Sequence, residues 1–128
     1  MDFKDNTKPI YLQLADRLCD NIICGEYGDD CRLPSVREFA ATVEVNANTV
    51  MRTYDYLQQS GVIYNKRGIG YFVVNGASKL IRTNRLNTFM NDELPDLFER
   101  MKLLEITPTE LSDMYTQYCA QQSTINDK

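Results

Sequence analysis

Two short stretches decide the fold of this chain, RLPSVREFA at residues 32–40 and NANTVMR at residues 46–52. In the first, Ser35 follows a proline and has Glu38 three places later, which is the capping box that begins a helix. In the second, Asn46 is a good N-cap for another helix. A short helix, a tight turn and a longer helix with a polar first turn therefore follow one another. This order is the outline of a helix-turn-helix.

The two expected helices divide their residues between an inner and an outer side. The apolar residues that recur at helical spacing are Val36, Phe39, Ala40 and Val43 in the first helix and Val50, Tyr54 and Leu57 in the second. The residues left for the outside of the second helix are Ala47, Asn48, Thr49 and Arg52. Amides, hydroxyls and guanidinium groups in the first turns suit a helix that enters a major groove. The local pattern alone still favours Asn46 as a plain cap and Arg52 as a solvated charge.

The segment after these helices predicts a β-hairpin. Gly61 stands where a glycine commonly ends a helix, and residues 62–66 and 71–74 are β-branched and aromatic runs. Between them lies RGIG at residues 67–70, a turn with two glycines and the adjacent cations Lys66 and Arg67. A basic Gly-x-Gly turn alone is weak evidence, because most such turns only connect strands. Directly after a capped polar helix, it predicts the wing of a winged helix, whose glycines let amides approach a phosphate or a minor groove.

Four motifs stand in order between residues 9 and 74: PIYLQL at 9–14, LPSVRE at 33–38, VNANTV at 45–50 and RGIGYFV at 67–73. This part of the chain resembles the N-terminal DNA-binding domain of GntR-type bacterial transcription regulators. The resemblance implies that DNA lies against Arg37, residues 46–49, Arg52 and the wing around Gly68.

We call the helix that begins at Asn46 the recognition helix. The expected DNA-binding surface combines residues at the start of the helix before it, residues of the recognition helix and residues of the wing: Arg32, Ser35, Arg37, Asn46, Ala47, Asn48, Thr49, Arg52, Lys66, Arg67, Gly68 and Gly70. Many relatives have Arg or another polar residue where this chain has Ala47 and Met51. More of the sequence selectivity then falls on Asn48 and Thr49, since Asn favours adenine edges and the Thr methyl favours a thymine methyl. Tyr71 stands where a small hydroxyl residue is common, and the sequence leaves open whether it faces DNA or packs under the wing.

Length and charge limit the classes of function. The chain has 128 residues, 43% of them hydrophobic, enough for one compact domain and an appendage. It has neither a long apolar stretch nor a basic and apolar leader, so a cytoplasmic protein without a membrane partner is expected. The formal net charge is −4, so a single copy should bind a duplex weakly and with strong salt dependence. Two copies on one palindrome would offset that weakness.

Histidine is absent, and the four cysteines are Cys19, Cys24, Cys31 and Cys119. Their spacing lacks the CxxC-like pairs of a zinc site, so neither a metal nor another cofactor is expected. Without His the common Ser or Cys triads are excluded, and an enzyme is the least supported class. Free thiols packed as small apolar residues are the favoured interpretation, although a redox switch among the first three cysteines stays open.

Helices are also expected before and after the helix-turn-helix and wing. Residues 9–24 repeat apolar residues at Ile10, Leu14, Leu18 and Ile22, and the loop that follows could pair with the hairpin by one bridge. Residues 78–106 fit a helix interrupted at Pro95, either by a kink or by a helix end with Asp92 capping the next helix. Thr107, Pro108 and Glu110 have the pattern that begins a further helix.

The helices after residue 75 are too few to enclose a usual metabolite pocket, and their apolar stripe needs a partner, most simply a second copy of the chain. The residues expected in that dimer contact are Leu80, Leu86, Phe89, Leu97, Phe98, Met101, Leu104, Leu111, Met114, Tyr115 and Tyr118. The GntR resemblance agrees, because so short a C-terminal region looks like the YtrA subgroup, whose two-helix tail is implied to dimerise.

We therefore expect a mainly α-helical protein with a small β-hairpin. A winged helix-turn-helix domain at 9–75 is followed by a helical dimerisation region at 76–121, with flexible tails at 1–8 and 122–128. The expected function is a homodimeric transcription regulator, a repressor on a pseudo-palindromic double-stranded DNA operator, with any small-molecule effector unknown. Two alternatives stay open: a thiol-based redox sensor, and a winged helix that binds another protein through Tyr54, Tyr56, Tyr64 and Tyr71.

Overall fold

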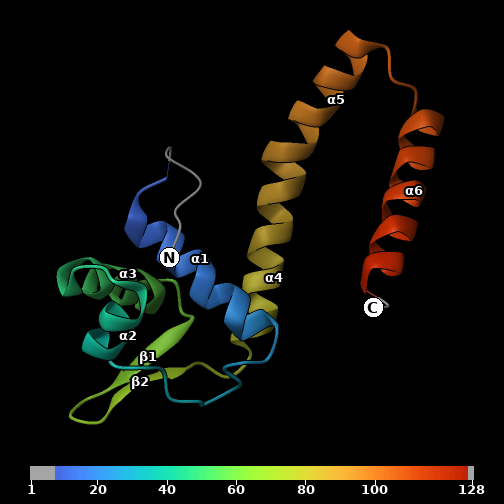
Figure 1. Ribbon diagram of the computed structural model, residues 1–128. Coiled ribbons are helices and arrows are strands. Elements are labelled where there is room, and N and C mark those ends of the chain that lie inside the picture. The colour runs from blue at the N-terminus through green and yellow to red at the C-terminus, as the bar shows by residue number, and fades with distance from the viewer. Residues whose placement is uncertain (1–7, 127–128) are drawn as a thin grey trace. The chain divides into compact units, whose positions relative to one another are not determined.

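The structure is a computed structural model that describes residues 8–126 and divides into two compact units between Arg85 and Leu86. The elements in chain order are α1 (Ile10–Ile23), α2 (Val36–Val43), α3 (Ala47–Gln59), β1 (Ile63–Lys66), β2 (Gly70–Val73), α4 (Ala77–Thr88), the π-helix η1 (Phe89–Glu93), α5 (Leu94–Leu104) and α6 (Pro108–Asn126). The expectation of a mainly helical winged helix with one hairpin is confirmed (Figure 1). Among the described residues, no helix is long and apolar enough to cross a bilayer.

The two helix starts of the helix-turn-helix have the caps that the sequence predicts. The Ser35 hydroxyl accepts a hydrogen bond from the Glu38 amide, and the Glu38 carboxylate accepts one from the Ser35 amide, each at 3.1 Å. At the start of α3, the Asn46 side chain accepts a hydrogen bond from the Asn48 amide at 2.8 Å. Each cap satisfies amides that a helix start leaves without a partner, so both boundaries are fixed locally.

The core of the N-terminal unit lies where α1, α2, α3 and the hairpin meet. Its fully buried side chains include Leu14, Leu18, Val50, Tyr54, Leu57, Ile63 and Val73. The Tyr54 hydroxyl donates to the Pro34 carbonyl at 2.6 Å, and the buried Thr53 hydroxyl donates to the Tyr11 carbonyl at 2.8 Å. Ile10 was expected on the inner stripe of α1 but is 44% exposed, because the first turn of that helix projects beyond the core.

The wing is an antiparallel hairpin whose register pairs Ile63 with Val73 and Lys66 with Gly70. The loop before α2 adds the expected single bridge, between Arg32 and Phe72. Around that bridge the Leu33 amide donates to the Tyr71 carbonyl and the Val73 amide donates to the Cys31 carbonyl, both at 2.9 Å. These bonds join the start of the helix-turn-helix to the wing, so both belong to one packed body.

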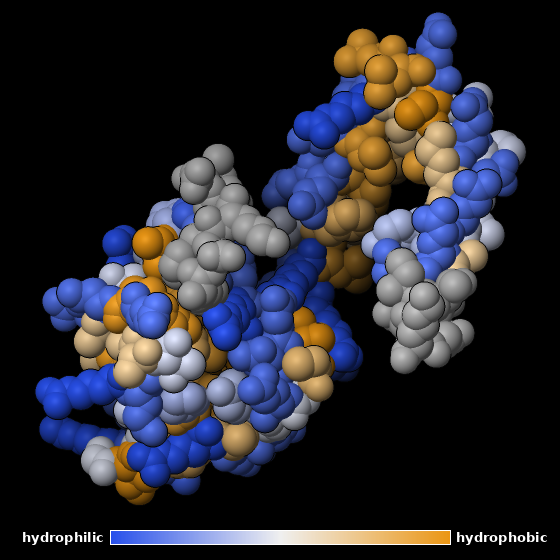
Figure 2. All heavy atoms as spheres, in the orientation of Figure 1, coloured by the Kyte–Doolittle hydropathy of each residue, from blue (hydrophilic) through white to orange (hydrophobic). Residues whose placement is uncertain are grey.

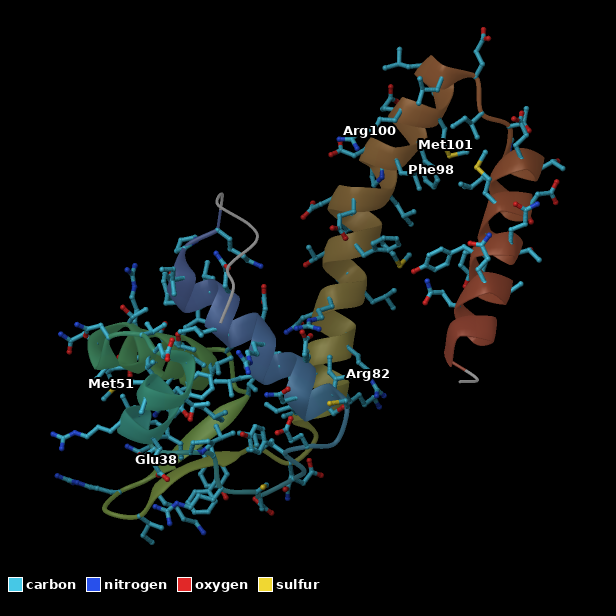
Figure 3. The ribbon with its side chains drawn as sticks, in the orientation of Figure 1. Glu38, Met51, Arg82, Phe98, Arg100 and Met101 are labelled. Atoms are coloured by element: carbon cyan, nitrogen blue, oxygen red, sulfur yellow. The ribbon has the colours of Figure 1, made fainter. Side chains whose placement is uncertain are left out.

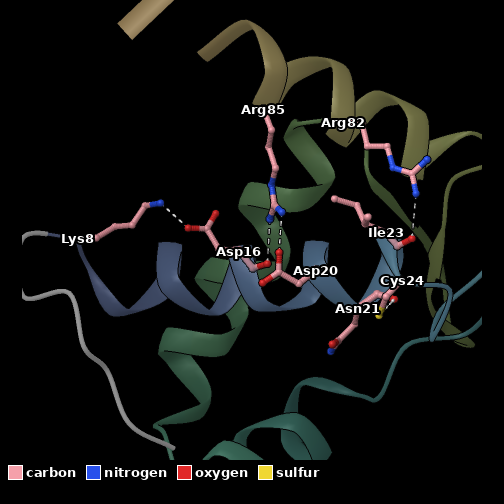
Figure 4. A network of polar contacts seen from close by, with 8 residues as sticks. All are labelled: Lys8, Asp16, Asp20, Asn21, Ile23, Cys24, Arg82 and Arg85. Carbon is pink, nitrogen blue, oxygen red and sulfur yellow. Dashed lines mark hydrogen bonds and ion pairs between the residues drawn. The ribbon is translucent and has the colours of Figure 1, made fainter. Parts of the chain in front are cut away.

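The N-terminal unit extends to Arg85, further than the expected domain end at residue 75. Figure 4 shows the polar contacts that Arg82 and Arg85 of α4 make with α1. Arg85 donates to the Asp20 carboxylate at 2.6 Å and to the Asp16 carbonyl at 3.1 Å, and Arg82 donates to the Ile23 carbonyl at 3.4 Å. Because Ala77 and Ile81 are also buried in the same core, α4 begins as part of the winged-helix unit.

The chain stays helical past Pro95, so of the two expected alternatives the helix end is wrong, and the interruption takes the form of a π-helical stretch before the proline. The Leu94 amide donates to the Phe89 carbonyl five residues earlier, which is the π-helical pattern, and no side chain caps α5, so Asp92 is not a cap. Proline lacks an amide proton and its ring strikes the carbonyl four residues before it. The wider π turn before Pro95 gives the ring room while the helix continues.

The final helix begins with the expected cap and runs longer than expected. The Glu110 amide donates to the Thr107 hydroxyl at 3.1 Å, and the Thr107 amide donates to the Glu110 carboxylate at 3.3 Å. α6 then continues to Asn126, into the segment expected as a flexible tail from residue 122, because a helix already formed adds further residues at little cost. Lys8, expected in a flexible tail, forms an ion pair with Asp16. Residues 1–7 and 127–128, also assigned to tails, lie outside the described residues.

Candidate nucleic-acid interface

The N-terminal end of α3 presents short polar side chains to solvent. Ala47 and Asn48 are exposed, whereas Thr49 is half-buried. The Asn46 oxygen is occupied by the Asn48 amide, so the Asn46 NH₂ group remains available to donate outward. The amide of Asn48 can donate to and accept from a base edge, which is what recognition of adenine requires.

The start of α2 carries an exposed cation. Arg37 is exposed and forms no hydrogen bond or ion pair with the described residues. Its neighbour Glu38 is held in the capping box, and the hydrogen bonds from Ser35 lower the pKa of its carboxyl. Glu38 is therefore committed to the cap, and Arg37 is left free for an anionic partner. The Ser35 hydroxyl already accepts one bond and still has its own proton to donate.

The wing carries two cations and two glycines of different kinds. A Cβ atom placed on Gly70, whose φ is 148°, would lie 3.1 Å from the Arg32 Nε, so glycine lets this guanidinium rest against the turn without a tight contact. Gly68 has a φ of 81° and open space around it. The Lys66 ammonium lies 4.7 Å from the centre of the Phe72 ring, and Arg67 is exposed at the turn. Arg32, Lys66 and Arg67 thus give the hairpin a positive surface.

Arg52 lies at the edge of this surface. Its guanidinium carbon is 4.0 Å above the centre of the Tyr11 ring, a cation–π contact between α3 and α1. The same ring meets Tyr56 edge-on with 6.2 Å between centroids. The sequence predicted a role for Arg52 on DNA without this contact, because Tyr11 is distant along the chain. The guanidinium remains exposed, and its planar stacking leaves its N–H groups free to reach a phosphate.

Tyr71 packs under the recognition helix, which answers the question that the sequence left open. Its ring meets Tyr54 edge-on at 4.9 Å between centroids, and its hydroxyl donates to the Met51 sulfur at 3.8 Å. Burial is the main cause that raises the pKa of Tyr71. Met51, which the sequence treated as a gap in the reading surface, is 42% exposed on α3 (Figure 3).

Comparisons with known proteins identify this combination of capped helices and wing. The sequence profile described as "Bacterial regulatory proteins, gntR family" matches residues 10–73. The chain belongs to the GntR family. Among curated relatives, it is 34% identical to the HTH-type transcriptional regulator YhcF of Bacillus subtilis over 106 residues, which cover 83% of this chain and 86% of YhcF.

Two further relatives extend the likeness beyond the winged helix. The HTH-type transcriptional repressor YtrA of Bacillus subtilis is 29% identical over 92 residues, 72% of this chain and 70% of YtrA. A crystal structure of a GntR-family transcriptional regulator from Bacteroides thetaiotaomicron matches with a TM-score of 0.77 and 48% identity, covering 89% of this chain and 99% of that one. The chain is therefore a GntR-family regulator with a DNA-binding winged helix, and its resemblance to the YtrA subgroup is supported.

The C-terminal unit of this GntR-family chain leaves most of its apolar side chains open. Figure 2 shows hydrophobic side chains gathered along the stretch from η1 to α5. The expected dimer-contact residues that are exposed are Leu86, Phe89, Leu97, Phe98, Leu104, Met114, Tyr115 and Tyr118, while Leu111 is half-buried. No side chain of α6 is buried among residues 108–122.

Two residues of the expected dimer contact have other surroundings. Met101 is only 8% exposed, because its own chain already covers it, although it lies with Phe98 on the side of α5 toward α6 (Figure 3). Leu80 belongs to the N-terminal unit, lies close to Gly61 at the end of α3 and is 37% exposed. Of the two, Met101 is less available to a second copy than the hydrophobic pattern alone indicated, whereas the part of Leu80 in a dimer contact stays a prediction.

Burial weakens both alternative functions, the protein-binding surface of tyrosines and the thiol-based redox sensor. Tyr54 is fully buried, so it cannot belong to a surface that binds another protein. Burial raises the pKa of the Cys19 thiol to about 11, which leaves almost no reactive thiolate near neutral pH. Cys24 and Cys119 are exposed, Cys31 is half-buried, and all four thiols are free. The described residues contain no group of three or more side chains arranged to hold a metal ion.

Proposed function

We propose that this GntR-family regulator binds a pseudo-palindromic DNA operator as a homodimer and represses transcription. The observation that carries the DNA part is the joint exposure of Asn48, Arg37 and the cations of the wing on one packed body. An amide that can pair with a base, a guanidinium without an internal partner and a basic hairpin supply base recognition and phosphate binding respectively.

The proposed contacts divide between phosphates and bases. Arg37, Lys66 and Arg67 bind phosphates, since they are exposed cations that set register without reading sequence. Asn48 reads a base edge in the major groove, with a smaller share for Thr49 because its side chain is half-buried. The remaining proposed contacts are Arg32, Ser35, Asn46, Ala47, Arg52, Gly68 and Gly70.

The homodimer is supported by the open apolar side chains of the C-terminal unit. Leu86 in α4 is 56% exposed and Phe98 in α5 is 50% exposed, and large apolar side chains left open together commonly mark an interaction surface. Because each of these side chains is already about half buried, covering it with a second copy would gain roughly 1 kcal/mol, about half the value for a fully exposed side chain. The role as a repressor is supported by the name of the relative YtrA, a transcriptional repressor.

Selection of bound fragments from random duplex DNA tests this proposal and supplies the operator. We expect an enriched pseudo-palindrome, and we expect Asn48→Ala to lower affinity for it about five- to 150-fold in a mobility-shift titration, as loss of a bidentate base contact costs about 1–3 kcal/mol. Gln59→Ala, at the exposed far end of the same helix, is the matched control and should leave affinity unchanged. Equal affinity of the wild type and Asn48→Ala would remove α3 as the reading helix.

A further inference from the structure

An apolar side chain stands in the middle of the polar reading surface. Met51 is 42% exposed on α3, one helical turn after the exposed Ala47 and beside Asn48. Its thioether can neither donate a hydrogen bond nor carry charge. The fold does not need it as core, because the buried residues of α3 are Val50, Thr53, Tyr54 and Leu57. Its surface is therefore open to an external apolar partner.

The wing holds this side chain in one place. The Tyr71 hydroxyl donates to the Met51 sulfur at 3.8 Å, and the Tyr71 ring rests edge-on against Tyr54 with 4.9 Å between centroids. Tyr54 is itself fixed, since it is fully buried and donates to the Pro34 carbonyl at 2.6 Å. A methionine side chain is ordinarily flexible and loses conformational entropy when it is ordered on binding. The contact with Tyr71 restricts Met51 before binding, so less of that entropy remains to be lost.

We infer that Met51, positioned by Tyr71, reads the methyl group of a thymine in the major groove. The C5-methyl of thymine is the apolar feature that distinguishes a base pair in that groove, and small apolar side chains recognise it. Ala47 adds a second apolar surface next to Met51, so the two form a continuous strip beside the amide of Asn48. The inference rests on the proposed function, in which the start of α3 lies in the major groove.

A purely structural role for Met51, as an anchor of the wing on α3, makes a different prediction. If Met51 is only an anchor, substituting it should lower DNA affinity, but removing the methyl group of a thymine should not. If Met51 reads the methyl group, the two changes are coupled: removing the thymine methyl lowers DNA affinity only while Met51 is present. The test therefore changes base and side chain in turn.

The experiment uses the full chain and the duplex enriched from random DNA. Each thymine is replaced singly by deoxyuridine, which removes the methyl and keeps base pairing, and affinity is measured by fluorescence anisotropy. For the wild type we expect one thymine per half-site whose replacement weakens binding about three- to fivefold, the value of one buried methyl group. Met51→Ala should bind the thymine and deoxyuridine duplexes equally at that position, and the inference is overturned if it still discriminates or if the wild type discriminates at no thymine.

A control variant separates Met51 from the other methyl-bearing residue. Thr49→Ser removes the Thr methyl while keeping the hydroxyl, and it should leave the Met51-dependent discrimination intact. If Thr49→Ser abolishes discrimination at the same thymine and Met51→Ala does not, the reader is Thr49 and the inference fails. Failure of the proposed function looks different, because then no duplex is enriched or Asn48→Ala binds like the wild type.

Tyr71→Phe tests the positioning role. It keeps the ring against Tyr54 and removes the hydroxyl that donates to Met51. We expect its melting temperature to stay close to that of the wild type while discrimination between thymine and deoxyuridine falls by about half, since Met51 then samples more conformations. Unchanged discrimination in Tyr71→Phe would contradict the positioning role of the hydroxyl.

Discussion

The two units of this chain differ in how far they bury their apolar residues. In the N-terminal unit, side chains such as Leu14, Leu18 and Tyr54 are wholly removed from water. In the C-terminal unit, Phe98 and Leu104 recur at similar helical spacing but stay open, and Met101 is buried by its own chain. The first unit has α1–α3, most of α4 and a hairpin to close a core, whereas the second has helices that do not enclose one another. Hydrophobic periodicity thus locates an apolar face, and the number of elements available decides whether the same chain covers it.

The largest difference between the two units should appear in stability. Tyr54→Ala removes a fully buried ring and its bond to Pro34, so we expect the free energy of unfolding to fall by about 3–5 kcal/mol. Phe98→Ala, measured in dilute solution where the chain is monomeric, should change it by less than about 0.5 kcal/mol. Urea denaturation followed by circular dichroism compares the two variants. Equal losses would mean that the C-terminal unit has a closed core.

Self-association should depend on the exposed face of α5. Phe98→Asp places a charge in the proposed dimer contact, and we expect the dimer dissociation constant to rise at least tenfold, since covering the half-buried ring is worth roughly 1 kcal/mol in each copy. Leu103→Asp makes the same change on the same helix, at a residue that is 82% exposed and outside the expected contact. Light scattering over a concentration series should show monomers for Phe98→Asp and dimers for Leu103→Asp. Dimers for both would place the contact elsewhere.

The cysteines of the two units should differ in reactivity. Burial raises the pKa of Cys19 to about 11 from an ordinary value of 9.0, so near neutral pH its thiolate fraction is about a hundredfold smaller than that of an ordinary thiol. Cys119 is exposed in α6 and should be alkylated rapidly by iodoacetamide. Because the thiolate forms only as the proton leaves, the rate at Cys19 should keep rising up to about pH 11. Peptide mass spectrometry of labelled native protein measures both rates, and fast labelling of Cys19 at pH 7 would revive the redox alternative.

Cations of the two units should contribute differently to DNA affinity. Arg37→Ala should weaken binding of the selected duplex about three- to thirtyfold and flatten the dependence of affinity on salt, because one phosphate contact is lost. Arg100→Ala removes the same charge from the C-terminal unit, where no DNA contact is proposed, and should leave the salt slope unchanged. Anisotropy titrations at several salt concentrations give both slopes. An equal loss in the two variants would show that only total charge matters.

The smallest effect is expected where the N-terminal unit ends. Arg85→Ala removes the ion pair with Asp20 and the bond to the Asp16 carbonyl, but both partners are solvent-accessible. Such surface pairs contribute about 0–1 kcal/mol, so the melting temperature should fall by only a few degrees. Ile81→Ala in the same helix removes a buried side chain and should cost more. A larger loss for Arg85→Ala would mean that the ion pair, rather than the apolar contact, holds α4 in place.

Local chemistry made the winged helix predictable from sequence. The caps at Ser35 and Asn46 and the glycine turn at residues 67–70 each depend on residues a few positions apart, and all three appear in the structure. Contacts between distant residues were not accessible in this way. Arg52 of α3 contacts the ring of Tyr11 in α1, and Met51 of α3 contacts the hydroxyl of Tyr71 in the wing. Because these partners are far apart along the chain, sequence spacing cannot predict the contacts.

In the C-terminal unit and at its boundary, too, some features could not be predicted from sequence spacing. The sequence marked Pro95 as an interruption, but the π turn that absorbs it depends on how the backbone relaxes over the preceding residues. The pattern that placed Met101 in the dimer contact could not show that its own chain buries it. The end of the first unit at Arg85 likewise depends on ion pairs and apolar contacts with α1, distant in sequence.

The stoichiometry of the DNA complex tests the central claim most directly. Wild-type protein is mixed with the selected duplex, and the mass of the complex is measured by size-exclusion chromatography with light scattering. The account predicts two chains on each duplex, with Phe98→Asp shifting the complex toward one chain at the same concentration. A wild-type complex with one chain per duplex, or no complex at low salt, would contradict it.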